Sequence, residues 1–115
     1  MNNDFLSNPS MLWSDYRPTP LLDLPALARL AGVARVFVKW EGVRPLGNFK
    51  SLGGMFAGLR MLARATGAAS MDELQAYCAS AAKPPRLITA SDGNHGLAVA
   101  AAAREAGDGL YARTA

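Results

Sequence analysis

One lysine of this sequence, Lys50, stands where amine chemistry could take place. It follows a loop with two glycines and a proline, residues 41–48, and opens a segment with helical periodicity. The positive end of a helix dipole disfavours an ammonium ion and favours the neutral amine, which is the form that attacks an aldehyde. An ordinary surface lysine is the alternative, and this position alone does not decide between the two.

A second candidate site lies in the string Ser91-Asp92-Gly93-Asn94-His95-Gly96, between a predicted strand and a predicted helix. Amide groups exposed at a helix start bind anions or polar oxygens, and glycines allow close approach to the backbone. Asn94 offers an amide donor to a phenolate-type oxygen, and Asp92 could accept a proton. A plain helix cap explains the string equally well, because Ser, Asp and Asn are all good caps.

Composition excludes several other classes of function. The 115 residues are half hydrophobic, with 12 basic and 9 acidic side chains, one histidine and one cysteine. The arginines are scattered, so we expect no nucleic-acid partner, and a single His95 and Cys78 predict no metal centre. The longest apolar run, residues 97–103, is too short for a bilayer, and residues 1–4 lack the features of a signal peptide. We therefore expect a cytoplasmic protein with no membrane partner.

The elements that would position the candidate residues alternate between strands and helices, which predicts an α/β fold with a parallel sheet. In such sheets ligands bind beyond the carboxyl ends of strands, where both candidate sites lie. Residues 1–16 look irregular, either packed as an arm or loose. We predict helices over 23–31, 49 or 50 to 66, 71 to about 82 and 95–106, and strands within 33–40 and over 86–90.

Two local patterns add detail to these helices. Ser70 followed by Glu73 predicts a capping box at the start of the helix from residue 71. Gly53, Gly54 and Gly58 weaken the helix that follows Lys50, by about 1 kcal/mol each relative to alanine. Small residues there indicate either close approach by a ligand or tight packing against another helix, and the sequence leaves both open.

Four strings in this order resemble fold-type II pyridoxal-phosphate enzymes, the group of tryptophan synthase β, threonine dehydratase and diaminopropionate ammonia-lyase. The resemblance covers about residues 17–107. It implies an incomplete form of a three-layer parallel sheet with flanking helices. Residues 1–83 would be an N-terminal arm and the start of the large cofactor-binding domain, and 84–115 the start of the small domain. The strings are Arg-Pro-Thr-Pro-Leu (17–21), Val-Lys-Trp-Glu (38–41), Asn-Phe-Lys-Ser-Leu-Gly-Gly (48–54) and Ser-Asp-Gly-Asn-His-Gly (91–96).

By this resemblance, the cofactor is pyridoxal 5'-phosphate and Lys50 forms a Schiff base with it, then moves protons at the substrate α-carbon. Phe49 would lie beside the cofactor, and Asn94 would hydrogen-bond its ring hydroxyl oxygen. Ser91 and Gly93 would bind the small amino-acid substrate. The family is also often homodimeric.

Asp92 distinguishes two branches of the family. Threonine dehydratases resemble Ser-Ala-Gly-Asn-His at this point, whereas diaminopropionate ammonia-lyases resemble Thr-Asp-Gly-Asn-His-Gly, with the aspartate as an acid/base group. The resemblance thus implies that 2,3-diaminopropionate is converted to pyruvate and ammonia, with a threonine or serine dehydratase-like lyase as the alternative.

The family's phosphate cradle and its partner for the pyridine nitrogen lie far downstream and have no counterpart here. Residues 106–115 do not predict the apolar strand that should follow the last helix, which is typical of a truncation, a frameshift or a degraded fragment. A non-catalytic remnant, or a piece that needs a partner to complete its site, is therefore a further alternative. We expect little or no turnover from the isolated chain.

Overall fold

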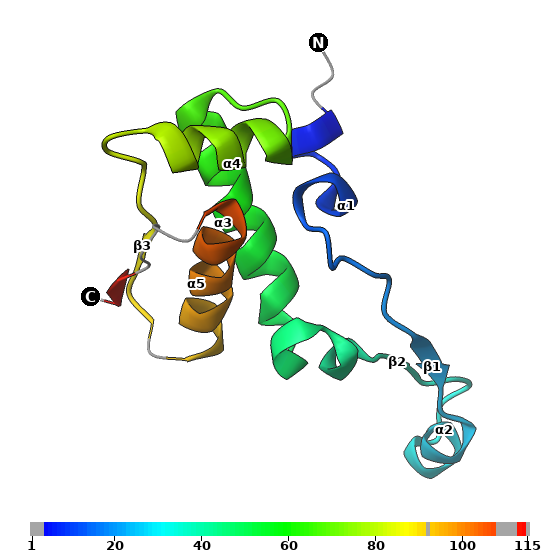
Figure 1. The fold of residues 1–115 in the computed structure, drawn as a ribbon. Helices are drawn as coiled ribbons and strands as arrows, with labels where there is room; N and C mark the ends of the chain where they lie inside the picture. Colours follow the sequence, from blue (N-terminus) through cyan, green and yellow to red (C-terminus); the bar gives the residue numbers. More distant parts are fainter. Residues whose placement is uncertain (1–3, 92, 108–112, 115) are drawn as a thin grey trace.

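The computed structural model describes residues 4–91, 93–107 and 113–114. At its centre lie two helices, α3 (Lys50–Thr66) and α5 (Asn94–Ala106), packed side by side (Figure 1). Both begin and end within a residue of the predicted bounds. Within the described ranges, every helix falls short of the length and hydrophobicity that a membrane span requires.

Glycines set the separation of α3 and α5. A Cβ placed on Gly58 would lie 2.7 Å from Cβ of Ala102, and one on Gly54 would overlap Cβ of Ala98. Real Cβ atoms do not approach so closely, so only glycine permits this packing. A Cβ on Gly53, in contrast, would face open space. Tight helix packing, one of the two predicted alternatives, therefore accounts for Gly54 and Gly58 but not for Gly53.

A third helix, α4 (Met71–Ser80), crosses the end of this pair and closes the core through Leu74. The Ser70 hydroxyl accepts the backbone N–H of Glu73 at 3.2 Å, which confirms the predicted cap. The Glu73 carboxylate accepts the N–H of Ala69 rather than that of Ser70, at 2.8 Å, so the box closes one residue earlier than the standard motif. The helix ends two residues before the predicted boundary.

The N-terminal segment packs into the same core. It forms two short helices, η1 (Asp4–Leu6) and α1 (Pro9–Leu12), where an irregular chain was predicted. Phe5, Leu12 and Trp13 are at most 3% exposed. Of the two predicted states for residues 1–16, a packed arm or a loose end, the described part of this segment therefore matches the packed one.

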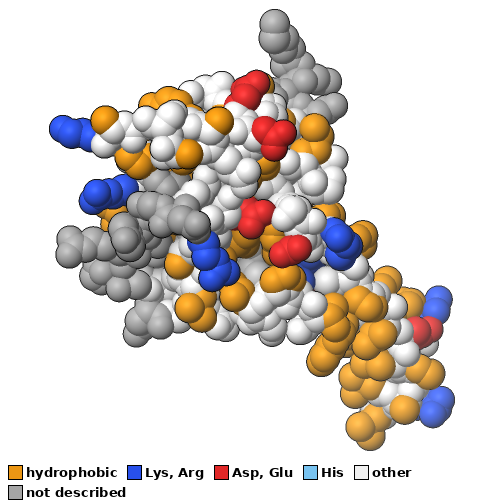
Figure 2. All heavy atoms as spheres, in the orientation of Figure 1, with side chains coloured by type: hydrophobic (Ala, Val, Ile, Leu, Met, Phe, Trp, Pro, Cys, Tyr) orange, Lys and Arg blue, Asp and Glu red, His pale blue; other side chains and the backbone are white. Residues whose placement is uncertain are grey.

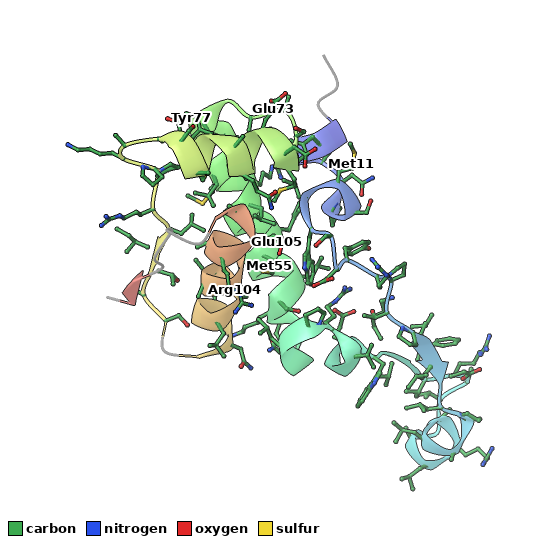
Figure 3. All side chains as sticks on the ribbon, viewed as in Figure 1. Met11, Met55, Glu73, Tyr77, Arg104 and Glu105 are labelled. Carbon is green, nitrogen blue, oxygen red and sulfur yellow. The ribbon has the colours of Figure 1, made fainter. Side chains whose placement is uncertain are left out.

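Polar contacts also fix the C-terminal half of α5. The Ser14 hydroxyl donates to the Glu105 carboxylate at 2.7 Å, and the Gln75 side chain donates to the Glu105 carbonyl at 2.9 Å. Figure 3 shows Glu105 between α4 and the N-terminal segment, with Met55 of α3 beneath it. These bonds hold the C-terminal end of α5 against α4 and against the segment that follows α1.

Residues 20–40 project from the helices (Figure 1). From here on, the arm means these residues and not the N-terminal segment 1–16. The arm consists of β1 (Leu21–Asp23), α2 (Pro25–Ala31) and β2 (Phe37–Lys39). The helix predicted from residue 23 begins at Pro25, because Asp23 belongs to the strand. It ends as predicted at Gly32, whose φ of 67° is left-handed. The radius of gyration is 17.3 Å, whereas a compact chain of this length has one of about 13 Å, so the arm stands apart from the core.

The described residues mix helices and strands as an α/β fold does, but they do not form the predicted three-layer parallel sheet. β1 pairs with β2 in an antiparallel ribbon, and β3 (Ile88–Thr89) pairs with β4 (Arg113–Thr114) in parallel. Each sheet has two strands among the described residues, and two-residue strands cannot form the middle layer of such a fold. β4 follows the last helix, but it comprises only Arg113 and Thr114 and is not the apolar strand of the family pattern.

Candidate functional site

The two central helices run parallel, which brings their N-terminal ends together. Gly54 faces Ala98 and Gly58 faces Ala102, so positions on α3 and α5 correspond with a constant offset of 44 residues. The same offset pairs Lys50, the first residue of α3, with Asn94, the first residue of α5. Both side chains are exposed. Two of the predicted site residues therefore lie at the same end of the helix pair.

The loop before Lys50 is held by two side chains that the sequence analysis did not single out. The Asn48 carboxamide accepts the N–H of Lys50 at 3.0 Å and donates to the carbonyl of Leu46 at 2.8 Å. The hydroxyl of Ser51, which is fully buried, donates to the carbonyl of Asn48 at 2.9 Å. An asparagine two residues before a helix is a capping residue type, and that signal could have identified it.

Leu46 takes an unusual backbone conformation in this loop, with φ of 68°. A side chain with a Cβ in the left-handed region costs on the order of 1–2 kcal/mol per residue. The Asn48 bond to its carbonyl and the buried Ser51 hydroxyl secure the turn in spite of that cost. Phe49, at its end, is 66% exposed and lies beside Lys50 in the chain.

The turn before α5 is organised by Ser91. Its hydroxyl accepts the N–H groups of Gly93 at 3.3 Å and Gly96 at 3.2 Å. A Cβ on Gly96 would lie 2.5 Å from the carbonyl oxygen of Ser91, so glycine is required there. Ser91 thus satisfies an N–H of the first turn of α5, although the N-cap residue is Gly93, which makes no side-chain bond, and not one of the polar residues predicted as caps. Gly93 and Asn94 are exposed. Asp92, the predicted acid/base group, lies outside the residues that the structure describes.

A polar cluster, here called the clasp, joins the base of the arm to the loop that leads to Lys50. The Glu41 carboxylate accepts from the Thr19 hydroxyl and from Nε and Nη2 of Arg44, the last at 3.1 Å. Arg44 also donates to the Arg17 carbonyl at 3.2 Å, and Lys39 donates to the Thr19 carbonyl at 2.5 Å. The bonds from Arg44 first, and then from Thr19, hold the pKa of Glu41 below its ordinary value. The sequence analysis named the strings that contain these residues but not their contact.

A groove of about 170 Å³ runs between α3, β3 and the start of α5. Gly54, one helical turn beyond Lys50, and His95, next to Asn94, both line it. Small residues of α3 form much of its lining, together with Leu87 and Val99. Among the residues described by the structure, no group of three or more His, Cys, Asp or Glu side chains could hold a metal ion.

The N-terminal ends of α3 and α5 carry groups that could bind an anionic aromatic aldehyde. Lys50 supplies an exposed amine, Asn94 an exposed carboxamide, and the two parallel helix ends a partial positive charge. Amine and aldehyde can combine covalently, and a carboxamide N–H can donate to a phenolate oxygen. These residues fit the aldehyde and hydroxyl side of pyridoxal phosphate. The downstream phosphate cradle named above is not among them.

Comparison with known proteins agrees with this fit. A family model described as pyridoxal-phosphate dependent enzyme matches residues 12–112. The chain is 38% identical over 97 residues to the diaminopropionate ammonia-lyase of Escherichia coli, covering 80% of this chain and 24% of that protein. It is also 38% identical over 90 residues to the threonine synthase of Synechocystis sp., covering 77% of this chain and 19% of that protein. No solved structure matches it significantly. The chain spans about a quarter or less of the length of these relatives, and the matches confirm the predicted family resemblance.

Proposed function

This chain belongs to the family of pyridoxal-phosphate dependent enzymes, and from that premise we propose that Lys50 is its cofactor lysine. The observation that supports the proposal is the parallel register of α3 and α5, because it brings Lys50 and Asn94, the first residues of the two helices, to the same end of the pair. Lys50 would hold the cofactor through its amine, with Phe49 beside the ring. Asn94 would donate a hydrogen bond to the ring hydroxyl oxygen.

In the whole protein we propose a carbon–nitrogen lyase reaction on 2,3-diaminopropionate. The bound cofactor supplies an electron sink that makes the substrate α-proton removable. Lys50 then takes that proton, and Asp92 donates a proton to the amine leaving the β-carbon. Overall, one water is taken up, and pyruvate and two molecules of ammonia are released. Ser91 and Gly93, in the turn that contains Asp92, would contact the substrate.

Asp92 and the relatives support this substrate over the alternatives. An aspartate stands here where the dehydratase pattern has a small residue. The similarity to a diaminopropionate ammonia-lyase points the same way. The threonine synthase is similar to this chain at the same identity, so the second candidate is the threonine or serine dehydratase-like lyase. We also propose a homodimer and a domain division after residue 83, which rest on the resemblance, and the cytoplasmic location expected from the sequence.

Borohydride reduction tests the role of Lys50 without requiring turnover. The chain is mixed with pyridoxal phosphate, reduced, digested and mapped by mass spectrometry. We expect one adduct per chain, on Lys50, which Lys50→Ala abolishes and Lys83→Ala leaves unchanged, because Lys83 is also exposed but lies far along the chain, after α4. An adduct spread over surface lysines, or none on Lys50, would refute the assignment.

Turnover assays separate the functional alternatives. Release of pyruvate from 2,3-diaminopropionate by the 115-residue chain would rule out the inactive remnant. An adduct on Lys50 without turnover would support a fragment that needs a partner. Activity on threonine but not on 2,3-diaminopropionate would favour the dehydratase-like alternative and contradict the proposed substrate.

A further inference from the structure

We propose that the arm, residues 20–40, is a docking surface for the polypeptide that makes up the remainder of the family fold. The inference rests on family membership and on the shape of this chain, and it does not depend on the substrate proposed above. Its evidence is the exposure of the arm, the open edges of its two strands, and the bonds that tie its base to the loop before Lys50.

The arm exposes large apolar side chains on every element. Leu30 of α2 is 85% exposed, and Leu21 of β1 is 63% exposed. Figure 2 shows the hydrophobic side chains gathered over the projecting arm, with charged groups only at its margin. Apolar patches of this kind on a soluble protein mark interaction sites. The other exposed apolar residues of the arm are Leu22, Leu27, Val33, Phe37 and Trp40.

The strands of the arm are also incomplete as a sheet. β1 and β2 pair only with each other, so each leaves one edge without a strand partner among the described residues. All three residues of β1 are exposed, and in β2 only Val38 is half-buried, so both faces remain largely open. A two-stranded ribbon is marginally stable alone in water, and free edges accept further strands. The fitting partner is therefore a polypeptide that adds strands and covers an apolar face.

The size of the relatives and the continuity with the candidate site identify that partner. The matched region makes up 24% of the E. coli lyase, which leaves about three quarters of its length without a counterpart here. The clasp ties the arm to the loop before Lys50 through Glu41 and Arg44. A polypeptide seated on the arm is therefore linked through the clasp to the loop that leads to Lys50. A second copy of this chain would cover the arm without supplying the part of the relatives that has no counterpart here.

Co-expression provides the test. The tagged 115-residue chain is co-expressed with the part of the E. coli diaminopropionate ammonia-lyase that lies C-terminal to the match, so that neither piece must fold alone. We expect the two to copurify at equal stoichiometry. Leu30→Glu should reduce the recovered partner by about tenfold or more, the effect of losing a central apolar anchor. Tyr77→Glu is the matched control, because Tyr77 is 44% exposed on α4, away from the arm (Figure 3).

Each other outcome contradicts the proposal. Failure to copurify, or equal recovery with Leu30→Glu and Tyr77→Glu, would show that the arm does not dock this polypeptide. A dimer of the 115-residue chain that Leu30→Glu abolishes, seen by analytical ultracentrifugation, would make a second copy the occupant instead. Lys50→Ala should copurify like the unmodified chain, so failure of the proposed chemistry and failure of the docking surface are distinguishable.

Discussion

Replacing Gly54 by alanine tests the helix packing on which the candidate site depends. The new Cβ would overlap Cβ of Ala98 on α5, and neither methyl can rotate away, because both are fixed to helical backbone. The adjacent Gly53 provides the matched control, since a Cβ there meets nothing within 4 Å. Both variants gain the same intrinsic helix propensity, so their difference isolates the contact between α3 and α5.

The magnitudes follow from these two terms. Alanine in place of glycine inside a helix stabilises by about 1 kcal/mol, and we expect Gly53→Ala to gain roughly that free energy of unfolding. Overpacking a tight core contact costs about 1–3 kcal/mol. Gly54→Ala should therefore lie about 1–3 kcal/mol below Gly53→Ala in stability. For a chain of this size, that difference corresponds to about 4 °C in melting temperature per kcal/mol.

The assay is urea unfolding followed by circular dichroism, with thermal melts as a second measurement. The two variants should move to opposite sides of the unmodified chain, or at least separate in the stated order. Equal stability of Gly53→Ala and Gly54→Ala would mean that α3 and α5 do not touch at this point. The register that pairs Lys50 with Asn94 would then have no support, and with it the proposed cofactor site.

Two further predictions concern ionisable groups. Because the folded-state pKa of Glu41 is lowered, its carboxylate stabilises the folded chain above the ordinary value of 4.5, and this contribution is lost as the pH falls through the lowered value. Urea midpoints measured between about pH 3 and 7 should therefore fall more steeply on acidification for the unmodified chain than for Glu41→Gln, and parallel curves would contradict the clasp. Burial raises the pKa of the Cys78 thiol, so iodoacetamide should modify it more slowly in the folded chain than in urea, and equal rates would show that Cys78 of α4 does not pack into the core.

Helix boundaries could be predicted because their signals are local. Gly67 ends α3 with a left-handed φ of 73°, Ser70 caps α4 through a neighbour three residues away, and Gly107 follows α5. Strand partners could not be predicted in this way. The pairing of Leu21 with Lys39 joins residues 18 positions apart across a helix, and its antiparallel direction follows from how that helix turns back. The alternation of strands and helices predicts a parallel sheet because it treats two strands joined by a helix as parallel. Here α2 lies between β1 and β2, and the two strands are antiparallel.

The candidate site shows the same division between local and long-range information. The types of Lys50 and Asn94, and their place at helix starts, were available from the sequence. Positions 53 and 54 are both glycine, yet Gly54 packs against α5 and Gly53 faces solvent. Only the position of the neighbouring helix distinguishes them. The clasp was missed for a related reason. Thr19 and Glu41 are 22 residues apart, and no periodic pattern connects them.

The close packing of α3 and α5 does more than fill the core, because it fixes how far one helix can slide along the other. A slip of one turn would move Asn94 by about 5.4 Å relative to Lys50, more than the reach of a hydrogen bond. Such a slip would bring Gly54 out of line with Ala98 and Gly58 out of line with Ala102. It would also break the bonds of Glu105 with Ser14 and Gln75. A cofactor held by both helix starts needs one fixed separation between the amine and the carboxamide. The glycines of α3 thus act on the proposed chemistry through the register that they impose, although neither needs to touch the cofactor.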